Sequence, residues 1–136
     1  MITNAVAVKV KAKPEDVFRF LLEPKNLEQT VPSNLNIKIK REDFSGPSAL
    51  MHWTLTKKDG SKVEWTEAYT QYIENELLKW RSADGPLWEG SYHLQPVEGG
   101  TFLTMVETTD YFDSATQHEQ VLTEQLHKTK KLLEQQ

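Results

Sequence analysis

The order in which strand-like and helix-like patterns follow one another constrains this chain most. An alternating segment from Thr3 to Lys11 leads directly into a proline-led helical segment from Pro14 to Leu22. Strand-like segments then continue to Tyr111, and one amphipathic stretch from Ser114 to Glu134 closes the chain. A sheet that is interrupted early by short helices and followed by one long helix tends to wrap around something.

The two early helical segments carry clear start and stop signals. Pro14 suits the first turn of a helix, where a missing N–H is tolerated, and Glu15 follows at the positive end of the helix dipole. Pro24 breaks this helix, because the residue before a proline avoids helical dihedral angles. A second short helix is predicted over about residues 25–30, and Pro32 ends it.

The middle of the chain predicts strands at regular spacing, with turn signals between them. Asp59-Gly60 and Gly99-Gly100 are typical of hairpin turns, because glycine accepts positive φ. Short turns of this kind join antiparallel neighbours, so we expect one antiparallel sheet of about seven strands. The expected strands cover residues 3–11, 35–40, 48–56, 63–73, 77–82, 88–95 and 101–111.

Length and charge fit an ordinary soluble domain and disfavour several functions. A chain of 136 residues can bury a core, and we expect a single domain over residues 1–136. The formal net charge of −4 argues against a nucleic-acid partner, because phosphate binding needs clustered Lys and Arg. No apolar run approaches ~18 residues, so we expect no stable membrane insertion. The first residues lack the features of a signal peptide, which favours a cytoplasmic location.

Metal, thiol and nucleotide chemistry lack their usual motifs in this sequence. The chain has no Cys, which excludes disulfides and thiolate ligands. Its four His show neither the helical His-x-x-x-His spacing nor the strand His-x-His spacing of metal sites. Phosphate-binding glycine loops and the Gly-x-Ser-x-Gly motif are also missing. We therefore expect neither a metal nor a cofactor.

Alternation along the strands sorts the side chains between the two faces of the sheet. In residues 63–73 the odd positions are bulkier and more apolar, so they are predicted to point inward, Glu67 among them. Gly90 lies between large inward residues, which fits a bend or room for a ligand. On the last strand, either face is a nearly equal choice. The inward residues expected at a binding site are Trp53, Trp65, Tyr69, Trp80, Trp88, Tyr92, Met105, Glu107 and, from the last helix, Leu122.

The aromatic residues of this set have two interpretations. Large rings pack cores well, and Trp and Tyr each also carry a polar atom that needs a partner. The same rings on one curved sheet could instead wall a pocket for a flat, apolar ligand. Both interpretations stay open: the rings either fill the space or surround it.

Glu67 and His118 are the candidate catalytic residues. A carboxylate on an apolar face is costly to bury unless it is paired or protonated. Glu67 could therefore act as a general acid or base or anchor a ligand. It could instead simply pair with Arg81 or His93, or face a barrel mouth that is open to water. His118 falls on the inward stripe of the last helix, where it could contact a ligand or relay a proton. The alternative for His118 is a partly exposed, hydrogen-bonded residue near the start of the helix.

Three stretches together resemble the START-related proteins, also called the polyketide cyclase/dehydrase and lipid-transport (SRPBCC) superfamily. That superfamily opens with a strand, a helix start and a second helix, an order similar to VKVKAKPEDVFRFLLEPKNLEQTVP. Its penultimate hairpin and the end of its last helix resemble GSYHLQPVEGGTFLT and LTEQLHKTKKLLEQ. The resemblance covers essentially the whole chain, and it rests on the order and spacing of these pieces.

The resemblance implies a helix-grip fold of the α+β class. In this fold a curved antiparallel sheet grips a long C-terminal helix, and two short helices follow the first strand. Such proteins commonly keep a cavity for an apolar or amphipathic ligand between helix and sheet. Members include lipid and quinone carriers, hormone receptors, polyketide cyclases and chaperone activators, so the fold indicates the kind of site but not its chemistry.

Three functions are compatible with this sequence. The first is binding of a small hydrophobic molecule, aromatic or lipidic, by a monomer or homodimer. The second is a cyclase, dehydratase or aldol-type enzyme that uses a cavity carboxylate as general acid or base. The third is a protein-interaction module of the chaperone-activator or antitoxin type. This third function predicts a collapsed cavity and an exposed apolar patch.

Overall fold

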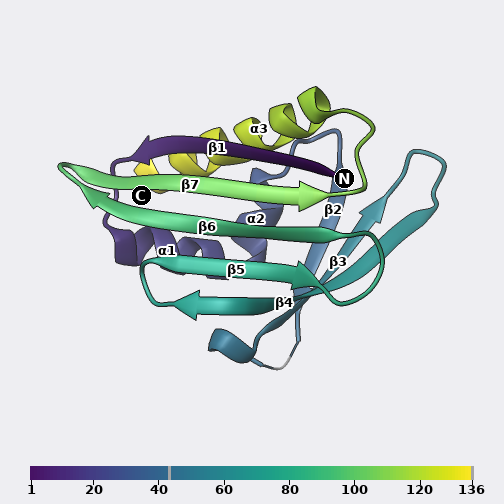
Figure 1. Cartoon of the computed structure of the whole chain (residues 1–136), viewed down its shortest axis with the longest axis horizontal. Helices are drawn as coiled ribbons and strands as arrows, with labels where there is room; N and C mark the ends of the chain where they lie inside the picture. Colours follow the sequence, from purple (N-terminus) through teal and green to yellow (C-terminus); the bar gives the residue numbers. More distant parts are fainter. Residues whose placement is uncertain (43, 136) are drawn as a thin grey trace.

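A seven-stranded antiparallel sheet forms the centre of the computed structural model, which describes residues 1–42 and 44–135 (Figure 1). The strand order is β1-β7-β6-β5-β4-β3-β2, so every neighbouring pair except β1 and β7 is consecutive in the chain. This arrangement confirms the antiparallel sheet predicted from the hairpin turns. The strands are β1 (Ile2–Val10), β2 (Asn36–Arg41), β3 (Leu50–Thr56), β4 (Lys62–Ile73), β5 (Leu77–Ser82), β6 (Trp88–Val97) and β7 (Gly100–Thr109).

The helices of the described residues gather on one side of this sheet. They are α1 (Pro14–Leu22), α2 (Pro24–Thr30) and α3 (Ala115–Glu134), with a short 3-10 helix η1 (Gly46–Ser48) before β3. Figure 1 shows α3 running beside β1, with α1 and α2 behind the sheet. Contacts of α1 with β6 and β7, and of α2 with β2 and α3, complete the α+β helix-grip fold. No helix among these is long and apolar enough to cross a membrane.

Local sequence signals fix where the helices begin and end. Pro14 and Pro24 occupy first-turn positions of α1 and α2, as the sequence predicted. Glu23 separates the two helices, and its carboxylate accepts a hydrogen bond from the backbone N–H of Lys25 at 3.5 Å. Ser114 caps α3, because its hydroxyl accepts from the backbone N–H of Gln117 at 3.1 Å.

The core lies between the concave face of the sheet and the helices. Its main cluster joins α1 and α3 to β5 and β7, with Leu78, Leu103 and Leu122 almost completely buried. A second cluster near the start of α3 combines Leu55, Trp65, Trp88 and Phe112. On β7, Met105 is 2% exposed and Glu107 is 8% exposed, so this face of the last strand points inward.

Gly90 marks a close approach on the concave face. It pairs with Trp80 on β5 and with Glu107 on β7. A Cβ atom added at Gly90 would lie 2.5 Å from Cζ2 of Trp80 and 2.6 Å from the carbonyl oxygen of Val106. The Trp80 ring therefore occupies the space that the missing side chain leaves, and that space is not kept for a ligand.

We expect Gly90→Ala to lower the free energy of unfolding by about 2 kcal/mol, because the added methyl group overpacks against Trp80 and a backbone carbonyl. Gly60→Ala is the control: Gly60 has φ +88, but a Cβ atom there would meet nothing within 4 Å. The control should cost only about 1 kcal/mol of backbone strain. Urea unfolding measures both variants, and equal losses would contradict the packing argument.

Candidate functional site

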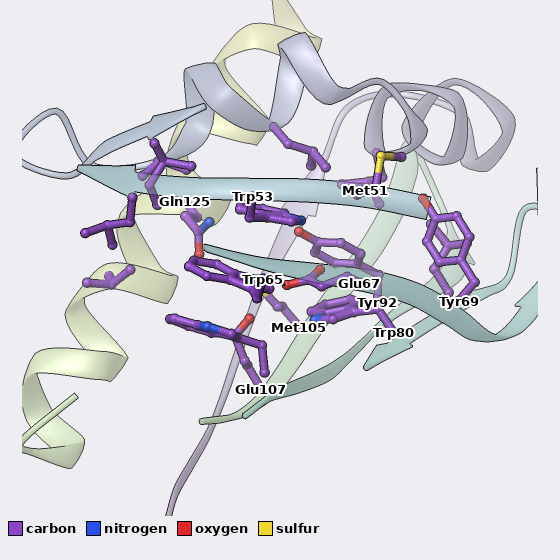
Figure 2. Close-up of a pocket in the computed structure, with 18 of the residues that line it drawn as sticks. Met51, Trp53, Trp65, Glu67, Tyr69, Trp80, Tyr92, Met105, Glu107 and Gln125 are labelled. Atoms are coloured by element: carbon purple, nitrogen blue, oxygen red, sulfur yellow. Dashed lines mark hydrogen bonds between the residues drawn. The ribbon is translucent and has the colours of Figure 1, made fainter. Parts of the chain in front are cut away.

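A small cavity lies between the concave face of the sheet and α3 (Figure 2). Its volume is about 70 Å³. This volume holds a few water molecules at about 15 Å³ each, but ligand pockets commonly start at about 300 Å³. The aromatic side chains therefore do both things that the sequence left open: they fill most of the interior and wall what remains.

The structure brings nine of the predicted site residues to the wall of this cavity. They come from β3 to β7, and Figure 2 labels most of them. His118 lies behind this wall against Glu107, and Leu122 belongs to the main core. The nine are Trp53, Trp65, Glu67, Tyr69, Trp80, Trp88, Tyr92, Met105 and Glu107.

The part of the wall that α3 contributes was missed at the sequence level. Val121 and Gln125 line the cavity, and Phe112 joins them from the segment before α3. Val121 and Gln125 are four residues apart and half-buried, beside the fully buried stripe that contains Leu122. Their helical spacing could have placed both residues on the inward side of the helix, but Gln125 is polar and so does not extend the apolar stripe.

Three indole rings form a stack across the sheet. Trp53 and Trp65 are directly paired between β3 and β4, and their ring centroids lie 5.8 Å apart at an interplanar angle of 12°. Trp65 and Trp88 follow at 4.9 Å and 20°. Strand β5 ends at Ser82, which pairs with Glu67. Trp65 therefore has no paired residue in β5, and its ring can meet the ring of Trp88 from β6.

The loop after β5 is tied to β4. Asp84 accepts a hydrogen bond from the backbone N–H of Thr66 at 2.7 Å. Gly85 has φ +68, and a Cβ atom there would lie 2.5 Å from the carbonyl oxygen of Glu64 and 3.0 Å from Cβ of Trp65. The loop therefore packs tightly behind the indole stack.

The hydrogen bonds of the three stacked indoles differ. Trp65 donates from Nε1 to Oε2 of Glu67 at 2.7 Å. Nε1 of Trp53 and Nε1 of Trp88 are both buried, and neither has an acceptor among the described residues. A buried donor without an acceptor costs about 1–3 kcal/mol. Both residues line the cavity, so a bound molecule with suitably placed oxygen atoms would remove this cost.

Glu67 is buried without a cationic partner among the described residues. Arg81 pairs instead with Glu89 at 3.5 Å, and His93 hydrogen-bonds to Ser91 at 2.9 Å, so the two pairings considered for Glu67 are wrong. Burial raises the pKa of Glu67 to about 8; the hydrogen bond from Trp65 opposes this rise and repulsion from Glu107 adds to it. At neutral pH this carboxyl group is therefore mostly protonated and can donate a hydrogen bond into the cavity.

Two side chains, those of Asn4 and His118, form a series of hydrogen bonds that ends at Glu107. Nδ2 of Asn4 donates to the carbonyl oxygen of Ala115 at 2.9 Å and lies 3.0 Å from Nδ1 of His118. An amide nitrogen can only donate, so these hydrogen bonds assign Nδ1 of His118 as the acceptor and place a proton on its Nε2. Nε2 lies 3.1 Å from Oε1 of Glu107 and donates to it.

This series of hydrogen bonds changes the interpretation of His118 and of Glu107. His118 is 0% exposed, so the partly exposed alternative is wrong. Burial raises the pKa of Glu107, while the hydrogen bond from His118 opposes that rise. The cavity wall thus carries two buried carboxyl groups in different surroundings, one bonded to an indole and the other to an imidazole.

The whole chain matches one family of proteins. A family model described as "Polyketide cyclase / dehydrase and lipid transport" matches residues 1–134. The chain belongs to the polyketide cyclase/dehydrase and lipid-transport family. Membership confirms the resemblance seen in the sequence motifs. No curated protein matches the sequence significantly.

Solved structures of similar shape support the fold of this family member. Protein CV1439 from Chromobacterium violaceum is 19% identical, with a TM-score of 0.80 over 98% of this chain and 99% of that chain. TTHA0849 from Thermus thermophilus is 15% identical, with a TM-score of 0.79 over 96% of each chain. The di-domain ARO/CYC StfQ from the steffimycin biosynthetic pathway is 12% identical, with a TM-score of 0.73 over 98% of this chain and 51% of that one. Identities this low show a shared fold alone.

Glu67 makes the stability of the protein depend on pH. Because its pKa is raised to about 8, the folded protein keeps a proton between roughly pH 5 and 8 that the unfolded chain releases. The free energy of unfolding therefore falls as the pH rises through this window. Glu67→Gln removes this dependence, so the variant should gain up to about 1.4 kcal/mol per pH unit relative to the wild type. Urea unfolding at several pH values measures the difference.

Glu98→Gln is the matched control, because Glu98 is exposed in the turn between β6 and β7. Its stability relative to the wild type should stay constant over the same pH range. A Glu67→Gln variant that followed the control would show that Glu67 is ionised in the folded protein at neutral pH.

Proposed function

We propose that this protein binds a small apolar molecule that carries oxygen acceptors, in the cavity between the sheet and α3. The observation that carries the proposal is the pair of buried indole N–H groups, on Trp53 and Trp88, that lack acceptors among the described residues. Glu67 adds a third donor, because burial raises its pKa to about 8 and keeps it mostly protonated. The remaining wall is largely apolar. Such a wall favours a hydrophobic body with a carbonyl group over an alcohol or an amine, whose own donors would find few partners.

The cavity must expand to admit such a molecule, and its wall contains residues that allow this. Met51 and Met105 both line it, and methionine side chains adapt their shape at low cost. On the side of the cavity formed by α3, the lining residues Val121 and Gln125 are only half-buried. Membership of the polyketide cyclase/dehydrase and lipid-transport family supports the same assignment.

A protein-interaction module fits the molecule less well. That function predicts a collapsed cavity, whereas a small cavity is present. Two of the residues that line it, Trp53 and Trp88, carry indole N–H groups without acceptors among the described residues. The large hydrophobic side chains exposed in the described residues come from five different segments of the chain. They are Met1, Phe44, Ile73, Val97 and Phe102.

Two ligands of equal shape test the binding proposal. We expect 2-acetonaphthone to bind about tenfold more tightly than 2-isopropenylnaphthalene, because only the ketone offers an acceptor. Displacement of the fluorescent probe N-phenyl-1-naphthylamine measures both affinities. Trp53→Phe keeps an aromatic ring at this position but removes the N–H, so it should reduce the ratio of the ketone affinity to the hydrocarbon affinity, a ratio in which the effect of the smaller ring on both compounds cancels.

Tyr111→Phe is the control, because it removes a polar atom at the end of the same row of rings, outside the residues that line the cavity. It should bind both compounds as the wild type does. Equal affinities of the two compounds for the wild type would contradict an acceptor-binding cavity.

Acid–base catalysis is a second candidate, and one observation favours it. Glu67 lies on the cavity wall, is buried, and has no cationic partner in the part of the chain that the structure describes. A carboxyl group that is protonated near neutral pH can donate its proton to a bound carbonyl oxygen, while the carboxylate of Glu107 on the same wall takes the proton that leaves the adjacent carbon. Reversal of the two transfers returns both protons. Cyclase, dehydratase and aldol-type reactions all use this enolisation step.

Deuterium exchange into the methyl group of 2-acetonaphthone tests this step directly. In D₂O the wild type should exchange these protons at least about tenfold faster than Glu67→Gln, because general acid–base groups contribute about 10²–10⁴-fold. Mass spectrometry follows the exchange, and probe displacement follows binding. Binding that is lost in Glu67→Ala but kept in Glu67→Gln, whose amide can still donate, would support an anchor. Retained binding with lost exchange in Glu67→Gln would support an acid or base. Unchanged binding and exchange in Glu67→Ala would contradict both roles.

A further inference from the structure

A second, open hollow of about 250 Å³ lies beside one end of the cavity. Ala49, Met51 and Tyr69 line both spaces, so these three side chains form the wall between them. Figure 2 shows Met51 and Tyr69 together at one end of the cavity, with Gln125 at the other end. We call the outer hollow the vestibule; besides this wall, Arg19, Leu22, Glu23, Arg41, Ser45 and Gly46 line it.

The wall between the two spaces is thin and adaptable. Ala49 has a single methyl group as its side chain, and the unbranched side chain of Met51 can adopt several rotamers. Tyr69 is only half-buried. A change of the Met51 rotamer would join the two spaces into one elongated site. The joined site would reach the lower limit of about 300 Å³ for ligand pockets, which the cavity alone does not.

The vestibule has a basic character. Arg19 comes from α1 and Arg41 from the end of β2, and both are exposed. Burial raises the pKa of Tyr69 and the charge of Arg41 opposes that rise, which places this charge close to the shared wall. Glu23 is the acidic residue of the vestibule, and its carboxylate accepts a hydrogen bond from the backbone at the start of α2.

The inner cavity has the opposite preference. Glu107 is buried on its wall and in its ionised form would repel a negatively charged group, and the described residues of the wall supply no positive charge. Removing an anion from water into this apolar space would also be costly without a cationic partner. A ligand that carries a negative charge can therefore place that charge only outside the wall formed by Met51 and Tyr69.

We propose that the vestibule binds the anionic end of a ligand whose apolar body occupies the cavity, with Arg19 and Arg41 as the recognising groups. This inference rests on the proposed function and adds a charge to the ligand. The ligand class is an amphipathic anion that carries a carboxylate, sulfonate or phosphate. Guanidinium groups suit such planar or multidentate oxygen acceptors. The ion pair of Arg19 with Asp16, at 3.5 Å and with the Arg19 side chain 77% exposed, is weak enough to be exchanged for the ligand.

Two fluorescent probes that differ by one anionic group test the inference. 8-Anilinonaphthalene-1-sulfonate and N-phenyl-1-naphthylamine share their rings, and only the first carries a sulfonate. We expect the wild type to bind the sulfonate about tenfold more tightly, since two exposed ion pairs form. Arg19→Gln combined with Arg41→Gln should abolish this advantage. The affinity for the uncharged probe should stay unchanged, which also shows that the variant is folded.

Lys57→Gln combined with Lys58→Gln is the matched control, because it removes the same charge from the exposed turn between β3 and β4. It should retain the tenfold preference. The inference is overturned if the arginine variant keeps the preference, or if the lysine variant loses it equally. If the uncharged probe binds the wild type and the sulfonate binds no better, the vestibule assignment alone fails. If neither probe binds the wild type, the proposed function fails with it.

Discussion

A curved sheet whose concave face is covered by helices must fill the space between them with side chains, and the whole site depends on how this space is filled. Alternation sends every second residue of five strands into the same space. Here large rings supply most of the volume, and Gly90 makes room for one of them, Trp80. Rigid rings pack without closing every gap, because their shapes cannot adapt as aliphatic chains do. The small cavity is the remainder of this packing.

Polar atoms at the edges of these rings and strands give that remainder its chemistry. An interior with few waters favours the uncharged form of a carboxyl group, so Glu67 is a donor where a surface glutamate would be an acceptor. Glu107 has an imidazole behind it, and Asn4 orients that imidazole from the first strand. The interior thus disfavours negative charge, while arginines lie just outside its wall. Negative charge is therefore disfavoured inside the cavity and favoured at the surface beside it.

Much of the fold and part of the site could be predicted from the sequence. Proline positions, glycine turns and alternation predicted the helix starts, the hairpins and the inward face that holds Trp65 and Glu67, because these are local rules. The hydrogen-bond and ion-pair partners were not predictable, because they depend on which strands lie side by side. Glu67 accepts a hydrogen bond from Trp65 on its own strand, and Arg81 pairs with Glu89 on the neighbouring strand. The hydrogen-bond partners of His118 could not be predicted for the same reason, because Asn4 is 114 positions away in the chain.

The pairing of β1 with β7 joins residues at opposite ends of the chain, from Ile2 with Thr109 to Val10 with Thr101. Contacts so distant in sequence form slowly, because a long loop must close before they add stability. During synthesis the first strand has to wait until β7 and α3 have left the ribosome. Until then its edge stays unpaired and open to other chains. The cavity is therefore among the last features of this protein to form.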